Sequence, residues 1–257
     1  MTAEVPASAA GGMRGSEVER KRDGARSTLV WDVLKEVITA RAAQSGRTAL
    51  DIVDVGGGTG GFAVPFAALG HRVTVVDPSP DALAAAQRRA AEMRVTLTAV
   101  QGEADGLDSL AGERAADLII CHNVLEYVDS PAAAMAAIAR VLRPGATVSV
   151  LAANVVAAVL HRALAGRYAE ARQLLAADGS GAGAPRRFTL AGLTALIEGA
   201  GLRPGGAHGI RVFAGLLPGG AAADPGTADA LRALEEAAAV HPALRDIAAR
   251  LHVLGRR

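Results

Sequence analysis

The chain has 257 residues, of which 51% are hydrophobic and 21% are charged, with 27 basic and 26 acidic side chains. This balance is typical of a globular protein and excludes a fibrous or largely disordered one. With a formal net charge of +1, the protein as a whole does not attract polyanions electrostatically. Any contact with nucleic acid therefore has to rest on a local group of basic residues.

The cysteine content and the start of the chain bear on its surroundings. Cys121 is the single cysteine, which excludes an internal disulfide and a thiolate metal cluster. Residues 1–15 are rich in Ala, Gly and Ser and lack the basic start and apolar core of a signal peptide, so we expect a disordered tail. There is no run of about 18 apolar residues. These features predict a cytoplasmic protein that needs neither metal nor membrane, and they leave the oligomeric state open.

The first half of the chain alternates between helical and extended patterns. Residues 28–42 have the periodicity of an amphipathic helix, with Leu34 and Ile38 on its apolar face. Short apolar and β-branched segments then alternate with helical ones, as in a mostly parallel sheet that is covered by helices on both faces. The predicted strands are residues 49–55, 72–76, 95–101, 116–121 and 146–152, and the predicted helices are residues 62–69, 80–91 and 130–141.

This alternation ends near residue 153. Beyond it the sequence predicts a helical insertion and only one further short strand, at Val212 and Phe213. Gly201 is placed to end one of the helices. The predicted helices of this part are residues 155–177, 189–200, 227–239 and 242–254, with Gly- and Ala-rich loops at residues 178–185 and 214–225.

A glycine-rich turn follows the first predicted strand. Asp54 precedes a run that starts at Gly56 and lets a ligand approach the backbone closely, and the next helix then offers free N–H groups. Asp77 ends the second predicted strand, where a carboxylate can accept hydrogen bonds from both ribose hydroxyls of an adenosine. Gly56, Gly58 and Gly61 also fit the pattern of dinucleotide sites. The turn and the acid alone therefore leave open a methyl-transfer enzyme, a dinucleotide-dependent enzyme and a purely structural turn.

Three segments after the fourth predicted strand narrow this choice. They are HNVLEYV from His122, DSP from Asp129 and, after a helix, LRPG from Leu142. In this order the segments resemble those of class I S-adenosylmethionine-dependent methyltransferases. The resemblance implies a Rossmann-like sheet of seven mostly parallel strands and S-adenosyl-L-methionine as the cofactor.

The resemblance extends to one family, the bacterial tRNA 5-carboxymethoxyuridine methyltransferases. It covers most of residues 26–257 and implies one methyltransferase domain over residues 16–257. Within that domain, a cofactor-binding core would span about residues 26–153 and a substrate-facing part about residues 154–257. The similar residues are Arg26, Trp31, Asp54 to Gly60, Gly70, His71, Asp77, His122 to Tyr127, Leu142 to Gly145, Asn154, His161, Gly166, Gly209 to Phe213, His252 and Val253.

The family resemblance also implies roles for the cofactor site. An arginine ahead of the first strand would hold the methionine carboxylate in a charge-assisted pair, and a histidine after the fourth strand would lie near the cofactor. The implied cofactor-binding residues are Arg26 for the carboxylate, Asp54, Gly56, Gly57 and Gly58 around the methionine moiety, Asp77 for the ribose, Glu103 and Ala104 beside the adenine, and His122.

The chemistry of the methyl acceptor decides which other residues the reaction needs. A carboxylate acceptor is already ionised and needs a cation that orients it, for which Arg211 is the first candidate, with Tyr168, His161 and Arg186 behind it. A hydroxyl acceptor needs a general base, and His122 or His161 is the candidate. Arg211 and His122 are therefore the predicted catalytic residues.

Both tRNA and a small molecule remain open as acceptors. The relatives carry a lysine-rich run where residues 174–187 of this chain have only Arg186 and Arg187 as basic residues. That difference and the near-neutral charge favour a small acceptor, whereas the family-like last third of the chain favours tRNA. A regulator that binds the cofactor without transferring its methyl group is a further alternative. Asp77 as a helix cap and His122 as a packing residue are the corresponding structural alternatives.

Overall fold

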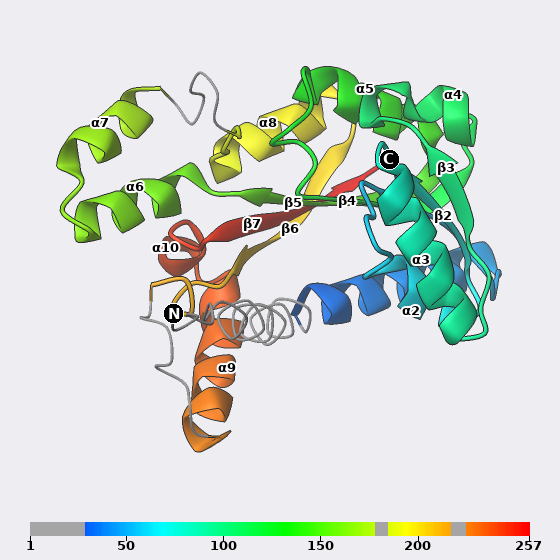
Figure 1. The fold of residues 1–257 in the computed structure, drawn as a ribbon, viewed down its shortest axis with the longest axis horizontal. Coiled ribbons are helices and arrows are strands. Elements are labelled where there is room, and N and C mark those ends of the chain that lie inside the picture. Colours follow the sequence, from blue (N-terminus) through cyan, green and yellow to red (C-terminus); the bar gives the residue numbers. More distant parts are fainter. Residues whose placement is uncertain (1–28, 178–184, 217–224) are drawn as a thin grey trace, which may run out of the picture.

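The computed structural model describes residues 29–177, 185–216 and 225–257. In this part of the chain a seven-stranded sheet crosses the molecule in the order β3-β2-β1-β4-β5-β7-β6, with helices on both faces (Figure 1). The strands are parallel except β7, which is antiparallel to both of its neighbours. This confirms the predicted α/β fold. The strands are β1 (Asp51–Val55), β2 (Arg72–Asp77), β3 (Thr98–Gln101), β4 (Ala116–His122), β5 (Leu142–Ala153), β6 (Arg203–Ile210) and β7 (Arg250–Arg256).

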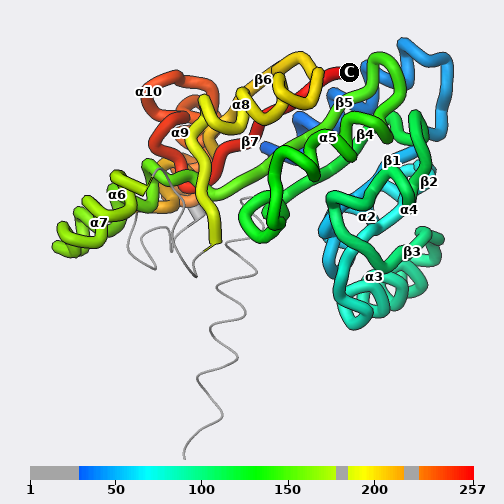
Figure 2. The backbone as a smooth tube through the Cα atoms, turned by 90° about the horizontal axis from the view of Figure 1, so that it is seen from above, coloured from blue at the N-terminus to red at the C-terminus, as the bar shows by residue number. Residues whose placement is uncertain are grey.

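Helices connect these strands, and one pair projects from the sheet. The two helices that follow β5 form the predicted insertion. They extend to the end of the molecule opposite β3 and the helix over Pro80–Glu92 (Figure 2). An initial helix covers residues 29–45. The others are α2 (Ala63–Ala68), α3 (Pro80–Glu92), α4 (Leu107–Ala111), α5 (Pro131–Val141), α6 (Val155–Leu164), α7 (Tyr168–Ala176), α8 (Leu190–Gly199), α9 (Pro225–Val240) and α10 (Pro242–Arg245), with a 3₁₀ turn η1 (Ala104–Gly106).

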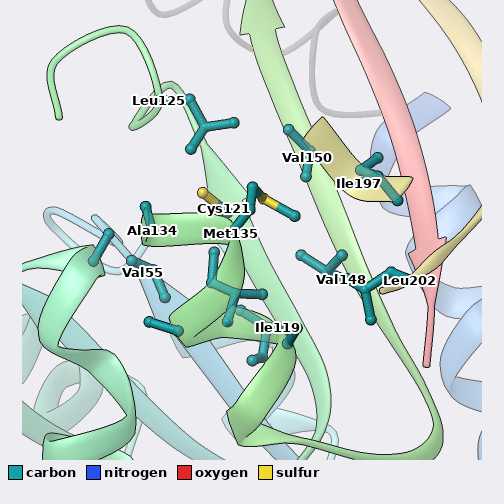
Figure 3. Close-up of a cluster of buried hydrophobic side chains, with 14 of the residues drawn as sticks. Val55, Ile119, Cys121, Leu125, Ala134, Met135, Val148, Val150, Ile197 and Leu202 are labelled. Carbon is teal, nitrogen blue, oxygen red and sulfur yellow. The ribbon is translucent and has the colours of Figure 1, made fainter. Parts of the chain in front are cut away.

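The sheet separates two apolar clusters. On one face, α5 and α8 supply Met135, Ile138 and Ile197, which pack against β4 and β5 (Figure 3). On the other face, the initial helix supplies Leu34 and α2 supplies Phe66. Strand β4 lies between the clusters and is buried at every position. Burial on both faces explains why this strand is a continuous apolar run instead of an alternating one.

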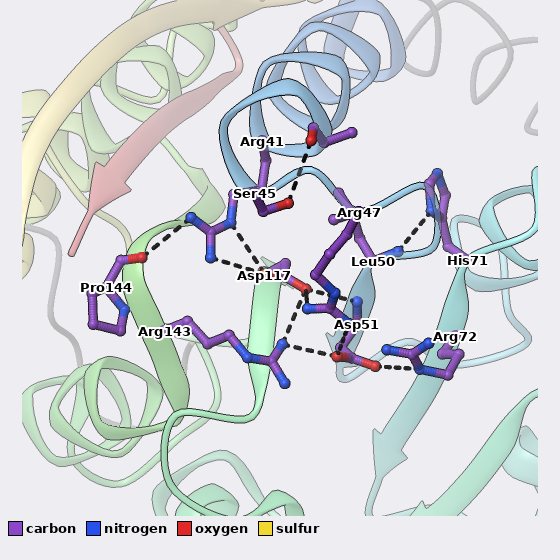
Figure 4. Close-up of polar contacts among 11 residues, drawn as sticks. Arg41, Ser45, Arg47, Leu50, Asp51, His71, Arg72, Asp117, Arg143 and Pro144 are labelled. Atoms are coloured by element: carbon purple, nitrogen blue, oxygen red, sulfur yellow. Dashed lines mark hydrogen bonds and ion pairs between the residues drawn. The ribbon is translucent and has the colours of Figure 1, made fainter.

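A cluster of ion pairs lies at the end of the sheet where β1 and β4 begin (Figure 4). The Asp117 carboxylate is fully buried and accepts hydrogen bonds from Arg41 (3.0 Å to Nη2), Arg47 (2.6 Å) and Arg143 (3.0 Å). Arg47 and Arg143 also pair with Asp51 at 2.8 Å. The cluster therefore joins the initial helix, β1, β4 and the start of β5 at the end of the sheet opposite the carboxyl ends of the parallel strands.

Two predictions for the last third of the chain are wrong. Val212 and Phe213 lie in a turn, and the strand precedes them as β6, whose Pro204 and adjacent glycines hide the strand pattern. The helix predicted over residues 242–254 is only the short α10, and most of the remainder is β7. A short apolar run fits a buried strand as well as a helix. Here the segment forms a strand because it pairs with β5 on one side and with β6 on the other.

Further boundaries differ from prediction, among them the start of β5, which lies at Leu142 and not at residue 146. The helix predicted over residues 155–177 is divided into α6 and α7 at Gly166, whose φ of +74° is left-handed. Strand β3 is shorter than predicted, and the short helices η1 and α4 were not predicted at all. The predicted loops at residues 178–185 and 214–225 lie mostly outside the described residues, as does the tail over residues 1–15.

No helix in the described ranges has the length and apolar character that a membrane span requires.

Candidate functional site

The glycine turn between β1 and α2 is built so that only glycine fits at its start. Gly56 and Gly58 have left-handed φ values of +64° and +54°. A Cβ atom on Gly56 would lie 2.4 Å from Cγ2 of Val124, and one on Gly57 would lie 2.7 Å from the carboxylate of Asp54. The turn is closed by a hydrogen bond of 2.7 Å from the Gly56 N–H to the Val76 carbonyl of β2. The backbone at Gly56 and Gly57 is therefore free of side chains at the carboxyl end of β1.

Asp54 is a buried carboxylate beneath this turn. Its side chain is 3% exposed. Burial raises the pKa of Asp54 to about 7, although a hydrogen bond from the Ala63 backbone N–H lowers it, and the nearby Asp77 adds to the rise. A carboxyl group with such a pKa is half ionised near neutral pH, so a cation bound nearby would favour its charged form.

Asp77 connects the glycine turn to the end of β2. Its Oδ2 accepts a hydrogen bond from the Gly58 N–H and its Oδ1 accepts one from the Ser79 N–H, both at 2.9 Å. Helix α3 is capped by Ser79, whose hydroxyl accepts from the Ala82 N–H at 3.2 Å, so the cap of this helix is not Asp77. Each oxygen of the Asp77 carboxylate keeps acceptor capacity for a further donor.

The segment after β3 lies beside Asp77. The Gly102 N–H donates to the Asp77 carbonyl at 3.3 Å. Glu103 follows as the exposed residue ahead of η1, and Ala104 is buried. The predicted residues Asp54, Gly56, Gly57, Gly58, Asp77, Glu103 and Ala104 thus come from the carboxyl ends of three neighbouring strands.

His122 is the last residue of β4 and is 9% exposed. Its ring packs edge-on against Phe62, the residue that precedes α2, with ring centroids 5.0 Å apart. Its Nε2 lies 2.7 Å from the Ser149 hydroxyl, whereas its Nδ1 is buried and finds no hydrogen-bond partner among the described residues. Burial lowers the pKa of His122 to about 3, so the ring is neutral at physiological pH.

Two features near His122 were not identified from the sequence. Ser149 also contacts His252, which lies on β7 and not on the helix that the sequence predicts over residues 242–254. Glu126 is 5% exposed, and its Oε1 accepts from the Ala153 N–H at 2.8 Å and lies 3.5 Å from Arg250. Burial raises the pKa of Glu126, and its Oε2 has no partner in the described part of the chain. The HNVLEYV segment contained Glu126, but its pairing with β7 could not be read from spacing.

The turn that follows β6 begins at Arg211 and passes close to His161 of α6. Arg211 follows β6 with a left-handed φ of +60°, and its guanidinium donates to the Ala214 carbonyl at 3.4 Å. The turn is held by the Glu235 carboxylate of α9, which accepts from three successive backbone N–H groups after Arg211. In the same turn, a Cβ atom on Gly215 would lie 3.9 Å from Nε2 of His161.

The remaining predicted residues are spread around this region. Arg186 donates to the Val128 carbonyl at 3.0 Å, and Tyr168 is 72% exposed at the start of α7. Arg26 lies outside the described residues. Within the described ranges, His, Cys, Asp and Glu side chains form no group of three or more that could hold a metal ion.

The sequence is similar to those of known methyltransferases. Residues 53–150 match the model of the family described as "Methyltransferase domain". The chain is 31% identical over 149 residues to the tRNA 5-carboxymethoxyuridine methyltransferase of Escherichia coli (strain K12), covering 56% of this chain and 54% of that protein. It is 36% identical over 129 residues to the ubiquinone biosynthesis O-methyltransferase of Methylococcus capsulatus, covering 49% and 52%. The chain thus spans about half the length of the curated relatives it matches.

Solved structures share the fold over nearly the whole chain. An S-adenosylmethionine-dependent methyltransferase from Mesorhizobium loti superposes with a TM-score of 0.57 at 20% identity, covering 92% of this chain and 100% of that one. One from Methanosarcina mazei also has a TM-score of 0.57, at 14% identity, covering 82% and 93%. Residues 53–150 of this chain therefore match a methyltransferase domain, and the chain shares the fold of solved S-adenosylmethionine-dependent methyltransferases.

Proposed function

We propose that this chain transfers a methyl group from S-adenosyl-L-methionine to an oxygen acceptor. The observation that carries the proposal is the glycine turn after β1, joined by Asp77 to the end of β2. Its side-chain-free backbone and its remaining carboxylate acceptors suit a ligand with a ribose and an amino-acid part. The buried carboxyl group of Asp54 beneath the turn, whose pKa burial raises to about 7, suits a ligand that carries positive charge.

In this proposal each part of the cofactor has its own residues. Asp77 would accept hydrogen bonds from the two ribose hydroxyls, and Glu103 and Ala104 would flank the adenine. Gly56, Gly57 and Gly58 would leave room for the methionine part, and His122 would be close to the reacting groups. Arg26 would pair with the methionine carboxylate. The bound cofactor supplies the electrophilic methyl group, and the protein aligns it with the acceptor and excludes water.

Two oxygen acceptors have support. The similarity to a tRNA 5-carboxymethoxyuridine methyltransferase favours a carboxylate on a tRNA uridine, which Arg211 would orient. The similarity to ubiquinone biosynthesis O-methyltransferases favours a hydroxyl on a small molecule. The unpartnered Nδ1 of the neutral His122 ring adds to the second, because it can accept a proton from a hydroxyl group.

A binding experiment tests the cofactor site. Asp77→Asn keeps the side-chain size but removes the charge and one acceptor, so we expect affinity for S-adenosylhomocysteine to fall by about 10- to 100-fold, as loss of a charged hydrogen bond does. Asp81→Asn, an exposed change on α3, is the matched control and should bind as the wild type does. Equal affinity of the two variants, with melting temperatures unchanged, would refute the assignment of Asp77.

A labelled-methyl assay tests transfer and the acceptor. Purified protein is incubated with labelled S-adenosyl-L-methionine and either tRNA or small-molecule extract from a host strain that lacks this protein. Label that digests to the methyl ester of 5-carboxymethoxyuridine identifies the tRNA acceptor. Label confined to the small-molecule fraction identifies a metabolite. Tight binding of S-adenosylhomocysteine without transfer to either fraction would instead indicate a regulator that binds the cofactor.

A further inference from the structure

A continuous row of hydrogen-bonding side chains crosses four neighbouring strands, from β4 through β5 and β7 to β6. Nε2 of His122 lies 2.7 Å from the Ser149 hydroxyl, which lies 2.7 Å from Nε2 of His252. Nδ1 of His252 lies 3.3 Å from Nδ1 of His208, and these two rings are inclined by only 25°. We call these four residues the histidine row.

The middle of the histidine row is closed to solvent, and its two ends differ. Ser149 and His252 have no exposed surface. At the β4 end, His122 contacts Phe62 beside the glycine turn, and its buried Nδ1 has no partner among the described residues. At the β6 end, His208 is half-buried, so water can reach it. The row therefore leads from the cofactor region of the site to the protein surface.

The three rings are neutral, and this fixes how protons can be arranged. Burial lowers the pKa of all three histidines, and the charges of Glu36 and Arg245 act on His208 in opposite directions. A neutral ring has one N–H, and each link in the row needs one donor and one acceptor. Only two arrangements satisfy every link and also give the Ser149 hydroxyl proton an acceptor within the row. In one of them Nδ1 of His122 is a bare acceptor, and in the other it carries the proton.

We propose that the histidine row is a proton relay, and that the methyl acceptor of this protein is a hydroxyl compound whose proton leaves through it. This rests on the proposed methyltransferase activity and names its substrate class. A carboxylate acceptor has no proton to lose at neutral pH, so it would leave the relay without a task.

The step balances in atoms and charge. The acceptor oxygen forms a bond to the methyl carbon, and the carbon–sulfur bond breaks with its electron pair remaining on sulfur. The hydroxyl proton moves to Nδ1 of His122, the Nε2 proton of His122 moves to Ser149, and the Ser149 proton moves to Nε2 of His252. The Nδ1 proton of His252 then moves to His208, which releases its Nε2 proton to water. Concerted movement leaves no imidazolium in the buried part of the row, where a charge would be costly.

The first test needs no turnover. In ¹⁵N spectra of histidine-labelled protein saturated with S-adenosylhomocysteine at pH 7, we expect protons on Nε2 of His122, Nδ1 of His252 and Nε2 of His208. Ser149→Ala should change the tautomer balance of His122 and His252. Thr147→Val, which removes a hydroxyl two residues away on the same strand, should change neither. A proton on Nδ1 of His122, a charged His122, or tautomers that ignore Ser149→Ala would overturn the relay.

The second test uses the acceptor that takes label from the small-molecule extract. Ser149→Ala should lower kcat by about 10- to 100-fold, part of the gain that proton transfer gives. Its KM for S-adenosyl-L-methionine should match that of the wild type and of Thr147→Val. The solvent deuterium effect should depend on several protons in the wild type and on one in Ser149→Ala. Equal rates for the two variants, or a methyl ester as the product, would overturn the proposal.

Failure of the proposed function has a different signature. If no fraction takes label, methyl transfer is refuted while the ¹⁵N spectra still decide the relay. If label enters tRNA carboxylates and the spectra show a bare Nδ1 on His122, methyl transfer stands and the assignment of a hydroxyl acceptor fails.

Discussion

Gly57 lies so close to the buried Asp54 carboxylate that a side chain does not fit there. A Cβ atom there would lie 2.7 Å from the Asp54 carboxylate and 3.0 Å from Val75, whereas a Cβ atom on Gly61 would have no neighbour within 4 Å. Neither glycine has a left-handed φ. Gly57→Ala therefore differs from Gly61→Ala in crowding alone.

We expect Gly57→Ala to lower the free energy of unfolding by about 1–3 kcal/mol, as overpacking does, and to weaken binding of S-adenosylhomocysteine. Gly61→Ala should leave the unfolding free energy within about 0.5 kcal/mol of the wild type. Urea unfolding and calorimetric titration measure the two effects. If both variants bind equally well, close approach of the ligand to Gly57 is not needed.

Asp54 should couple cofactor binding to proton release. With its pKa at about 7, the carboxyl group is half protonated at pH 7, and the sulfonium charge of S-adenosyl-L-methionine would favour ionisation. Titration calorimetry in two buffers of different ionisation enthalpy should show release of up to about half a proton at pH 7. S-adenosylhomocysteine, which has no sulfonium, should release less, and Asp54→Asn should release none. Equal release with both ligands would contradict this account.

At the scale of elements, β7 packs tightly against α8 and β5. A Cβ atom on Gly255 of β7 would lie 2.8 Å from Ile197 of α8 and 3.0 Å from Val148 of β5, whereas one on Gly205 of β6 would make ordinary contacts of 3.4 Å or more. Strand β7 thus lies where α8 closes over the sheet.

Gly255→Ala should destabilise the protein by about 1–3 kcal/mol, because two packed side chains have to move. Gly205→Ala should be nearly neutral, since its neighbours leave room. Thermal melting of the two variants measures the difference. Equal melting temperatures would mean that α8 and β5 can yield at Gly255 without cost.

At the scale of the whole molecule, the ion-pair cluster predicts an acid limit to stability. Burial raises the pKa of Asp51, but hydrogen bonds from Arg72, Arg47 and Arg143 outweigh this and lower the pKa from 3.8 to about 2. A lowered carboxyl pKa stabilises the fold above pH 4, and that stabilisation is lost as the pH falls from about 4 to about 2.

We expect Asp51 to supply about 1–2 kcal/mol of this acid-sensitive stability, because water screens its partly exposed ion pairs. Asp51→Asn should therefore be less stable at pH 7 and should lose less stability between pH 4 and pH 2. Asp81→Asn, on the surface, should follow the wild type. Urea unfolding at a series of pH values measures these curves. Parallel curves for wild type and Asp51→Asn would show that the acid limit lies in another group.

The sequence determined the class of fold and which residues make up one half of the candidate site, because both follow from local patterns. Apolar β-branched segments that alternate with helices specify a parallel sheet. A glycine run and an acid at consecutive strand ends bring Asp54, Gly57 and Asp77 together at the same edge of that sheet.

Only the tertiary structure decided the rest, because it depends on which strands pair. Strand β7 is inserted antiparallel between β5 and β6, and no local pattern distinguishes its apolar run from a helix. That insertion brings His252 to Ser149 and Arg250 to Glu126, although more than 100 residues separate each pair along the chain. Hydrogen bonds between residues so far apart arise from sheet register, so the histidine row became visible only once the strands were in place.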